Sequence, residues 1–285
     1  MTNTMGESAC MQKVSVIMGI YNCEKTLDEA LQSILHQTYT NWEVILCEDG
    51  SSDSTYDIAQ KYVNAYPNQF LLLKNEKNMG LNFTLNRCLE RASGAYIARM
   101  DGDDISLPER FQKQVEFLDR HSEYDIVSTP MIFFDESGEW GRNHLIAEPQ
   151  ITDFVYHAPV HCHAPSMIRV RAFRAVNGYT EDPRYLRFED CNLWYKLYTA
   201  GYRGYNLSEP LYKMRDDYAA MKRRRAGDRL RAAYVQYTGF CMVKMPLRYY
   251  PCLLTMLIKQ LILICMPKQL YMFLRKRKIN GRQSG

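Results

Sequence analysis

The chain has 285 residues, of which 46% are hydrophobic and 24% charged, with a formal net charge of +4. This composition excludes wholesale disorder and suits a globular domain of roughly 200–250 residues plus an extension. The nine cysteines form no Cys-x-x-Cys pair, so we expect free thiols in a reducing compartment. Residues 1–12 have neither a basic start nor an apolar core, which argues against a secretory signal and predicts a cytoplasmic protein.

The first hundred residues alternate between apolar runs and segments of helical periodicity. Residues 14–20, 42–47, 70–73 and 96–98 are predicted strands, and the segments between them carry apolar side chains every three or four positions. Alternation at this pace predicts an α/β fold built from parallel βαβ units with right-handed crossovers.

Polar side chains follow three of these strands. Tyr21 comes after the first strand, Asp49 after the second and Asp101 after the fourth. Ligands of open parallel sheets bind beyond the carboxyl ends of the strands. We therefore expect these three residues to converge on one binding edge.

The segment Asp101-Gly102-Asp103-Asp104 places three carboxylates around a glycine. Hard divalent cations such as Mg2+ or Mn2+ prefer oxygen ligands, and a glycine lets the backbone come close to what the carboxylates hold. The cluster is therefore a candidate metal site. Taken alone, it is equally consistent with a polar turn that caps a helix starting near Pro108.

Beyond Pro108 the pattern becomes less regular. A helix is predicted at residues 111–121, strands at 126–129 and 131–134, and a turn at 135–138. Residues 157–165 read as a loop that contains His161 and His163. An isolated His-x-His pair is a weak metal motif, and we favour ordinary loop histidines.

Glu189 and Asp190 precede an apolar helical face formed by Leu193, Trp194 and Leu197. Carboxylates in the first turn of a helix complement its dipole, which is the simplest interpretation of the pair. Gly201 suits the end of the same helix.

The C-terminal end is apolar and basic. Residues 249–266 are almost wholly apolar, and lysines and arginines gather at residues 222–225 and 275–278. The apolar run is shorter than the roughly 20 residues that span a bilayer. It fits an interfacial membrane helix or, equally, a buried or oligomer-forming helix.

Taken together, the motifs resemble the inverting family 2 glycosyltransferases, which have the GT-A fold, and among them bacterial enzymes of extracellular-polysaccharide and biofilm-matrix synthesis. The resemblance covers residues 13–215 and leaves 216–285 as a helical C-terminal extension. It implies a Rossmann-like, mostly parallel central sheet flanked by helices. The matching segments are Val14–Asn22, Gln37–Tyr39, Glu48–Ser51 with Asp53, Asn78–Gly80, Ala92–Ile97, Asp101–Asp104 with Pro108–Arg110, Glu189–Trp194 and Glu209–Arg215. Glu48 stands where many members carry aspartate.

This resemblance implies metal-dependent transfer of a sugar from a nucleotide-diphosphate sugar, with a UDP-sugar expected, to a glycan or lipid-linked acceptor. A membrane surface or membrane-bound partner is expected at the extension, and no nucleic acid. The metal, Mg2+ or Mn2+, would be held by Asp103 with Asp101. Donor contacts are expected from Tyr21, Asn22, Glu24, Asp49, Gly80, Asp101 and Arg215, with Tyr21 stacking on the base and Asp49 accepting a hydrogen bond from its imide.

An inverting transfer also needs one general base to take the proton of the attacking acceptor hydroxyl. By analogy this base is Asp190, with Glu189 beside it to bind the acceptor or tune the base. Two carboxylates alone would also fit a glycosidase, but a metal cluster at the edge of a parallel sheet does not favour hydrolysis.

Two other functions compete with this interpretation. A nucleotidyltransferase would carry a Gly-rich basic loop after the first strand, and residues 21–25 do not. A non-catalytic or bifunctional protein could keep the fold and dock onto a protein partner. The intact acidic motifs argue against loss of activity, because docking alone has no chemical need for them.

Overall fold

The computed structural model describes residues 11–157, 159–216 and 226–266, together with residues 270, 274, 277 and 279. Basic segment 222–225 and most of 275–278 lie outside the described residues. The first half of the chain forms β1 (Val14–Ile20), α1 (Leu27–Leu35), β2 (Trp42–Glu48), α2 (Thr55–Ala65), β3 (Phe70–Lys74), α3 (Leu81–Arg91), β4 (Tyr96–Arg99), β5 (Ile105–Ser106) and α4 (Arg110–Arg120).

The second half is less regular, as the sequence predicts. It contains β6 (Ile126–Ser128), β7 (Met131–Asp135), β8 (Gly138–Arg142), α5 (Phe154–His157), β9 (Met167–Arg169), α6 (Val170–Ala175), α7 (Glu189–Thr199), β10 (Gly204–Asn206), β11 (Tyr212–Arg215), α9 (Ala226–Met242) and α10 (Pro251–Cys265), with short 3-10 turns at Ile151–Asp153, Pro183–Tyr185 and Leu247–Tyr249.

The strands form two sheets. The larger has the order β10-β6-β9-β4-β1-β2-β3 and is parallel except for β9, which runs antiparallel to both β4 and β6. The smaller has the order β5-β11-β7-β8. The predicted α/β class and mostly parallel sheet are therefore confirmed, and the four predicted strands of the first hundred residues match β1–β4 to within one residue at each end.

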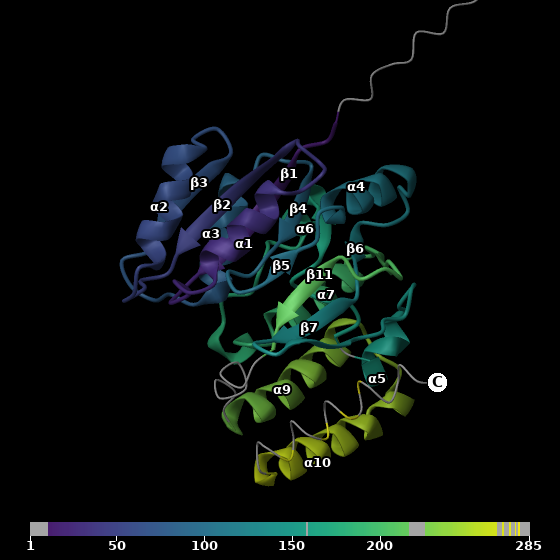
Figure 1. The fold of residues 1–285 in the computed structure, drawn as a ribbon. Coiled ribbons are helices and arrows are strands. Elements are labelled where there is room, and N and C mark those ends of the chain that lie inside the picture. The colour runs from purple at the N-terminus through teal and green to yellow at the C-terminus, as the bar shows by residue number, and fades with distance from the viewer. Residues whose placement is uncertain are drawn as a thin grey trace, which may run out of the picture.

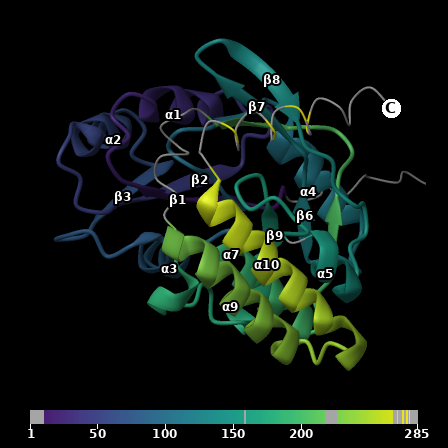
Figure 2. The ribbon, with the colours of Figure 1, turned by 90° about the horizontal axis from the view of Figure 1, so that it is seen from below.

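Alternation along the central strands builds an apolar layer on each face of the sheet. Val16 and Met18 of β1 pack in one layer with α1, α2 and α4, while Ile17 points into the other layer with α3, α6 and α7. Figure 2 shows the strands between α1 and α2 on one side and α3 and α7 on the other. This double covering explains why the strands are apolar runs without polar alternation.

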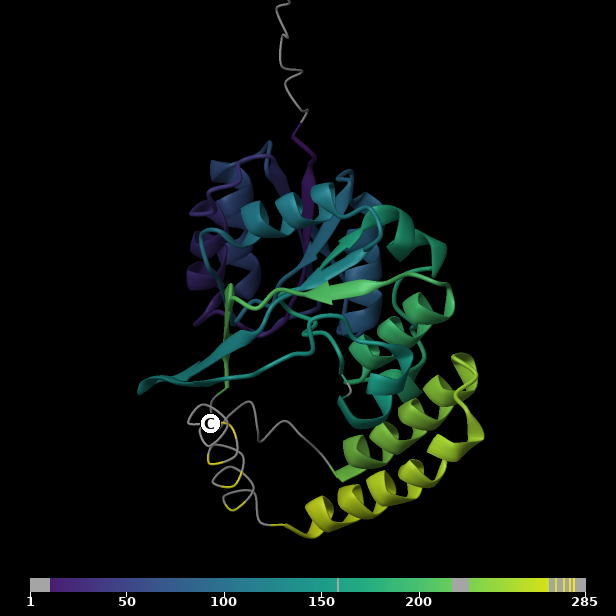
Figure 3. The ribbon, with the colours of Figure 1, turned by 90° about the vertical axis from the view of Figure 1, so that its right-hand side faces the viewer.

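The last helices extend the second layer outward. Helix α9 packs on α7, and α10 packs on α9 (Figure 1). Seen from the side in Figure 3, α10 is the outermost of these helices. In the described part of the chain, no helix combines the length and the apolar character needed to cross a membrane.

Candidate functional site

The acidic loop directly follows β4. One carboxylate oxygen from each of Asp101, Asp103 and Asp104 lies within 4.8 Å of the others. Asp104 is buried, and its burial, together with the charges of Asp101 and Asp103, raises the pKa of its carboxyl well above the ordinary value. Three carboxylates this close repel one another in the absence of a cation. The donor set is all oxygen and fits Mg2+ or Mn2+.

The structure assigns Asp104 a contact that its sequence position does not predict. Its Oδ1 accepts a hydrogen bond from the backbone N–H of Arg215, at 2.8 Å. The alternative interpretation of the segment as a helix cap is wrong, because α4 begins at Arg110 with Glu109 at its N-cap and β5 lies in between. Asp104 instead joins the acidic loop to β11.

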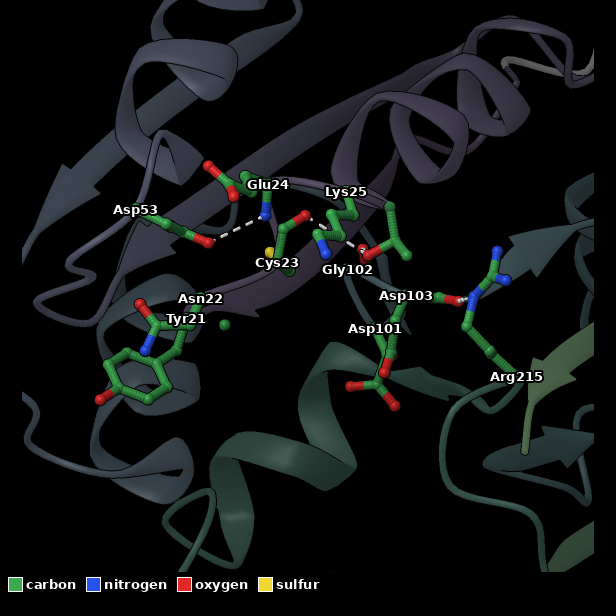
Figure 4. A pocket seen from close by; sticks show the side chains of 12 residues that line it. Tyr21, Asn22, Cys23, Glu24, Lys25, Asp53, Asp101, Gly102, Asp103 and Arg215 are labelled. Carbon is green, nitrogen blue, oxygen red and sulfur yellow. Dashed lines mark hydrogen bonds between the residues drawn. The ribbon is translucent and has the colours of Figure 1, made fainter. Parts of the chain in front are cut away.

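A pocket of about 370 Å³ opens between the acidic loop and the end of β1 (Figure 4). Six of the predicted site residues line it, namely Tyr21, Asn22, Glu24, Asp101, Asp103 and Arg215. The lining does not include the predicted residues Asp49, Gly80, Glu189 and Asp190. Parallel β1 and β4 are neighbours in the sheet, so their following loops meet at the edge that the sequence predicts.

Tyr21 and its neighbours hold the wall opposite the acidic loop. Tyr21 is 48% exposed and lines the pocket, which leaves its aromatic side chain accessible to a ligand. Asn22 adopts a positive φ of 47° and its side-chain oxygen accepts a hydrogen bond from the Ser52 N–H at 2.9 Å. The Glu24 carboxylate accepts one from the Ser54 N–H at 3.1 Å. Asn22 and Glu24 therefore brace the loop after β1 against the loop after β2.

Asp49 directly follows β2, is buried, and organises the next loop. Its Oδ1 accepts hydrogen bonds from the Asn75 side chain and the Met79 N–H, both at 2.7 Å, and its Oδ2 accepts one from the Gly80 N–H at 3.0 Å. Gly80 has a φ of 91°, a conformation that favours glycine. Asp49 thus fixes the backbone of residues 79–80, and Oδ2 keeps a further acceptor position.

The cationic side of the pocket comes from the smaller sheet. The Arg215 guanidinium donates to the Asp103 carbonyl at 3.1 Å and to the Glu29 carboxylate at 2.6 Å, and it lies over the Phe134 ring at 4.5 Å. These contacts hold a positive charge beside the acidic loop.

Two cations near the site were not predicted from the sequence. Arg99, at the end of β4, is buried and pairs with Asp101. Burial alone would lower the pKa of its guanidinium, but the charge of Asp101 more than offsets this and the pKa is raised. Lys25 is exposed on the pocket wall. The sequence does contain one indication of the role of Arg99, because it is a charged residue at the end of an otherwise apolar strand.

Glu189 and Asp190 form the first turn of α7. The Asp190 Oδ1 accepts a hydrogen bond from the Cys191 N–H at 2.7 Å. Burial, reinforced by the charge of Asp190, raises the pKa of Glu189 to about 7, and burial also raises the pKa of Asp190. A carboxylate pair that gains a proton close to neutral pH is suited to general-base chemistry.

His161 and His163 lie in a segment without regular structure, as predicted, but both are buried. The two ring nitrogens of His161 lie 2.7 Å from the Asn206 side-chain oxygen and 3.0 Å from the Tyr198 hydroxyl. His163 lies 2.7 Å from the Tyr179 hydroxyl. Burial lowers the pKa of His161 to about 4. They are neutral, hydrogen-bonded core residues.

Comparison with known proteins identifies the family. Residues 15–176 match the model of glycosyl transferase family 2. The chain is 42% identical over 273 residues, 96% of each chain, to the putative glycosyltransferase EpsE of Bacillus subtilis. It is 32% identical to the amylovoran biosynthesis glycosyltransferase AmsE of Erwinia amylovora, over 78% of this chain and 84% of that one.

The fold agrees with this match. The crystal structure of S. aureus TarS residues 1–349 in complex with UDP-GlcNAc superposes with a TM-score of 0.64 at 19% identity, covering 87% of this chain and 80% of that one. The predicted GT-A fold and transferase activity are confirmed, and an inverting mechanism is consistent with the family. The chain therefore belongs to glycosyl transferase family 2 and is a glycosyltransferase.

Proposed function

We propose that this glycosyltransferase transfers a sugar, with inversion, from a UDP-sugar to a glycan or lipid-linked acceptor in the synthesis of an extracellular polysaccharide, and that it needs Mg2+ or Mn2+. The observation that carries the proposal is the pocket that joins the exposed Tyr21 ring to the three-carboxylate loop. One wall suits a flat base and the opposite wall suits a diphosphate bound through a cation. The TarS structure contains UDP-GlcNAc, which supports a UDP-sugar as donor. The similarity to the amylovoran biosynthesis glycosyltransferase AmsE supports a role in polysaccharide synthesis.

Donor binding is assigned to the edge of the sheet. Tyr21 stacks on the base, and the remaining acceptor position of the Asp49 Oδ2 receives the base imide N–H. Gly80, Asn22 and Glu24 shape the loops around the base and ribose. Arg215, already oriented by Glu29 and the Asp103 carbonyl, places a cation beside the diphosphate.

The metal is assigned to Asp103 and Asp101. Once bound, a divalent cation would neutralise charge that develops on the leaving diphosphate. Arg99 fixes Asp101 in place through their ion pair. Asp104 holds the loop to β11, which keeps the carboxylates of Asp101 and Asp103 toward the pocket.

Asp190 is assigned as the general base. An acceptor hydroxyl attacks the anomeric carbon from the face opposite the nucleotide, and Asp190 takes its proton as the new bond forms. Glu189 raises the basicity of Asp190 through its negative charge and offers an acceptor for a second hydroxyl. No covalent enzyme intermediate forms, because a single displacement inverts the anomeric centre.

We place the catalytic unit at residues 13–215 and a C-terminal extension at 216–285, and we place the protein in the cytoplasm, where nucleotide sugars are made. The extension packs on α7 through α9. It therefore contacts the helix that carries the proposed base.

UDP binding measured by calorimetry tests the proposal. Binding should be tight with Mn2+ and weaker by roughly a hundredfold with a chelator. Asp103→Ala should remove the effect of Mn2+, because the main carboxylate ligand is gone. Asp57→Ala, an exposed carboxylate on α2, is the matched control and should bind as the wild type does. If Asp103→Ala kept its Mn2+-dependent binding, the metal assignment would be wrong.

A further inference from the structure

Helix α10 exposes large aliphatic side chains on the side turned away from the protein. Leu254 is 62% exposed, Ile258 48%, Leu261 48% and Ile262 58%. Their spacing places all four on one helix face. Leu247, in the turn before the helix, is 82% exposed. These five residues, called here the outer face of α10, form a group rather than isolated surface side chains, and such groups mark interaction sites.

The other side of α10 is already occupied. Cys252 and Leu253 pack against the core layer that contains α7 and α9. Figure 3 shows α9 between α10 and the rest of the protein. The outer face therefore cannot turn inward unless these contacts break.

Charge distribution indicates what covers the outer face. Residues 243–285 contain nine lysines and arginines and no aspartate or glutamate, whereas residues 1–225 contain 31 acidic and 25 basic residues. Lys244, Arg248 and Lys259 are exposed close to the outer face in sequence. Apolar side chains beside an excess of positive charge match the interface of a bilayer with anionic headgroups.

We propose that the outer face of α10 inserts into the interfacial layer of a membrane that contains anionic lipids, with the helix lying parallel to the surface. At 15 residues, α10 is about 22 Å long, shorter than the hydrocarbon core. The helix lies on the membrane and does not span it. Lys244, Arg248 and Lys259 contact headgroups while the aliphatic side chains enter the boundary with the acyl chains.

A second copy of the chain is the competing occupant. Pairing two outer faces would bring two strongly basic segments together, with no carboxylate in residues 243–285 of either copy to compensate. Like charges at such an interface are unfavourable. An anionic surface instead complements the charge and covers the apolar side chains at the same time.

Membrane binding would give the C-terminal extension a role in sugar transfer to a lipid-linked acceptor. This role rests on the function proposed above. Helix α9 packs on both α10 and α7, and α7 begins with Glu189 and Asp190. The bilayer surface would thereby sit at a fixed height from the proposed base. A lipid-linked acceptor diffusing in the membrane meets a site that is already oriented toward it.

Co-sedimentation of the full-length protein with lipid vesicles tests the proposal. We expect binding to vesicles of phosphatidylcholine with phosphatidylglycerol, and at least about tenfold weaker binding to phosphatidylcholine alone. Ile258→Glu should weaken binding to the anionic vesicles by about tenfold or more, because a carboxylate replaces an exposed aliphatic group that would otherwise enter the membrane. Leu71→Glu, at another exposed leucine on β3, is the matched control and should bind as the wild type does.

A second variant separates the electrostatic contribution to vesicle binding from the contribution of the inserted apolar side chains. Lys259→Glu should also weaken binding to anionic vesicles by about tenfold while leaving binding to phosphatidylcholine unchanged. Circular dichroism of each variant checks that the helices are intact. Equal binding of wild type, Ile258→Glu and Leu71→Glu would overturn the proposal. So would a wild-type dimer in vesicle-free solution that Ile258→Glu dissociates, without any binding to vesicles.

UDP binding with Mn2+ distinguishes this inference from the proposed function. Ile258→Glu should bind UDP normally, because the outer face is remote in the fold from the donor pocket. Vesicle binding without UDP binding would contradict the proposed UDP donor and metal site only. UDP binding without vesicle binding would contradict the membrane proposal only.

Discussion

The two halves of the chain supply side chains to the candidate site in different ways. In residues 13–100, each strand and the helix after it are neighbours in both sequence and space, and parallel β1, β2 and β4 deliver Tyr21, Asp49 and Asp101 to one edge. In residues 101–266, the corresponding side chains come from separated segments. Arg215 reaches Asp103 from β11 and Glu189 stands on α7.

This difference indicates a division of labour. The regular half forms the proposed donor-binding wall around Tyr21 and Asp49, where hydrogen bonds such as those of Asp49 with residues 79–80 hold the loops. The irregular half brings the proposed base on α7 and the helices α9 and α10, whose positions depend on packing between helices. Chemistry and donor binding should therefore be separable by mutation.

The largest effect is expected for Asp190→Asn. Loss of the general base should lower kcat by about 10²–10⁴-fold, while the affinity for UDP with Mn2+ stays unchanged, because the donor wall is intact. Glu181→Gln, an exposed carboxyl that precedes the 3-10 turn Pro183–Tyr185, serves as the control. Steady-state kinetics with calorimetry measures both quantities. Retained turnover would remove Asp190 as the base, and full function in cells despite lost turnover would favour a docking role.

An intermediate effect is expected where α9 meets α7. A Cβ atom at Gly239 would lie 2.2 Å from the Tyr195 ring, so Gly239→Ala should push the helices apart and lower the free energy of unfolding by about 1–3 kcal/mol. At Gly227, in the same helix, a Cβ meets nothing within 4 Å. Gly227→Ala should instead raise it by up to about 1 kcal/mol. Urea unfolding measures both. Equal stability of the two variants would show that the α9–α7 contact is loose.

The smallest effect concerns pH. Because the pKa of Glu189 is raised to about 7, the pair takes up a proton as pH falls through this value, and kcat/KM should fall with it. Glu189→Gln should shift the midpoint downward by about one unit, since Asp190 then lacks a charged neighbour. An unshifted pH profile would show that the two carboxyls do not interact.

The raised pKa of Glu189 also makes the free energy of unfolding depend on pH. A carboxyl whose pKa rises on folding holds its proton more tightly in the folded state. Its contribution to the free energy of unfolding therefore declines as pH rises from about 4.5 to about 7. Glu189→Gln should therefore be less sensitive than the wild type to pH over this window in urea unfolding. A larger decline in the variant would contradict the assignment.

Much of the regular half could be predicted from the sequence, because β1–β4 are apolar runs bounded by polar turns. Strands β5, β9 and β10 have only two or three residues, which is too few to show the alternation of apolar and polar residues typical of a strand. They form because neighbouring strands supply hydrogen bonds. The contact of Asp104 with Arg215 joins residues 111 positions apart. Likewise, the burial of His161 depends on Asn206 and Tyr198, which no local pattern connects.

The antiparallel strand β9 sets the order in which the central sheet can assemble. Strands β4 and β6 do not pair with each other, because β9 lies between them. During synthesis, β1–β4 can form a parallel unit, but β6 has no place in the sheet until residues 167–169 leave the ribosome. Until then the edge of β4 stays open to pairing with other chains. A chain that stops before β9 would therefore be a fragment prone to aggregation, and would not be a smaller enzyme.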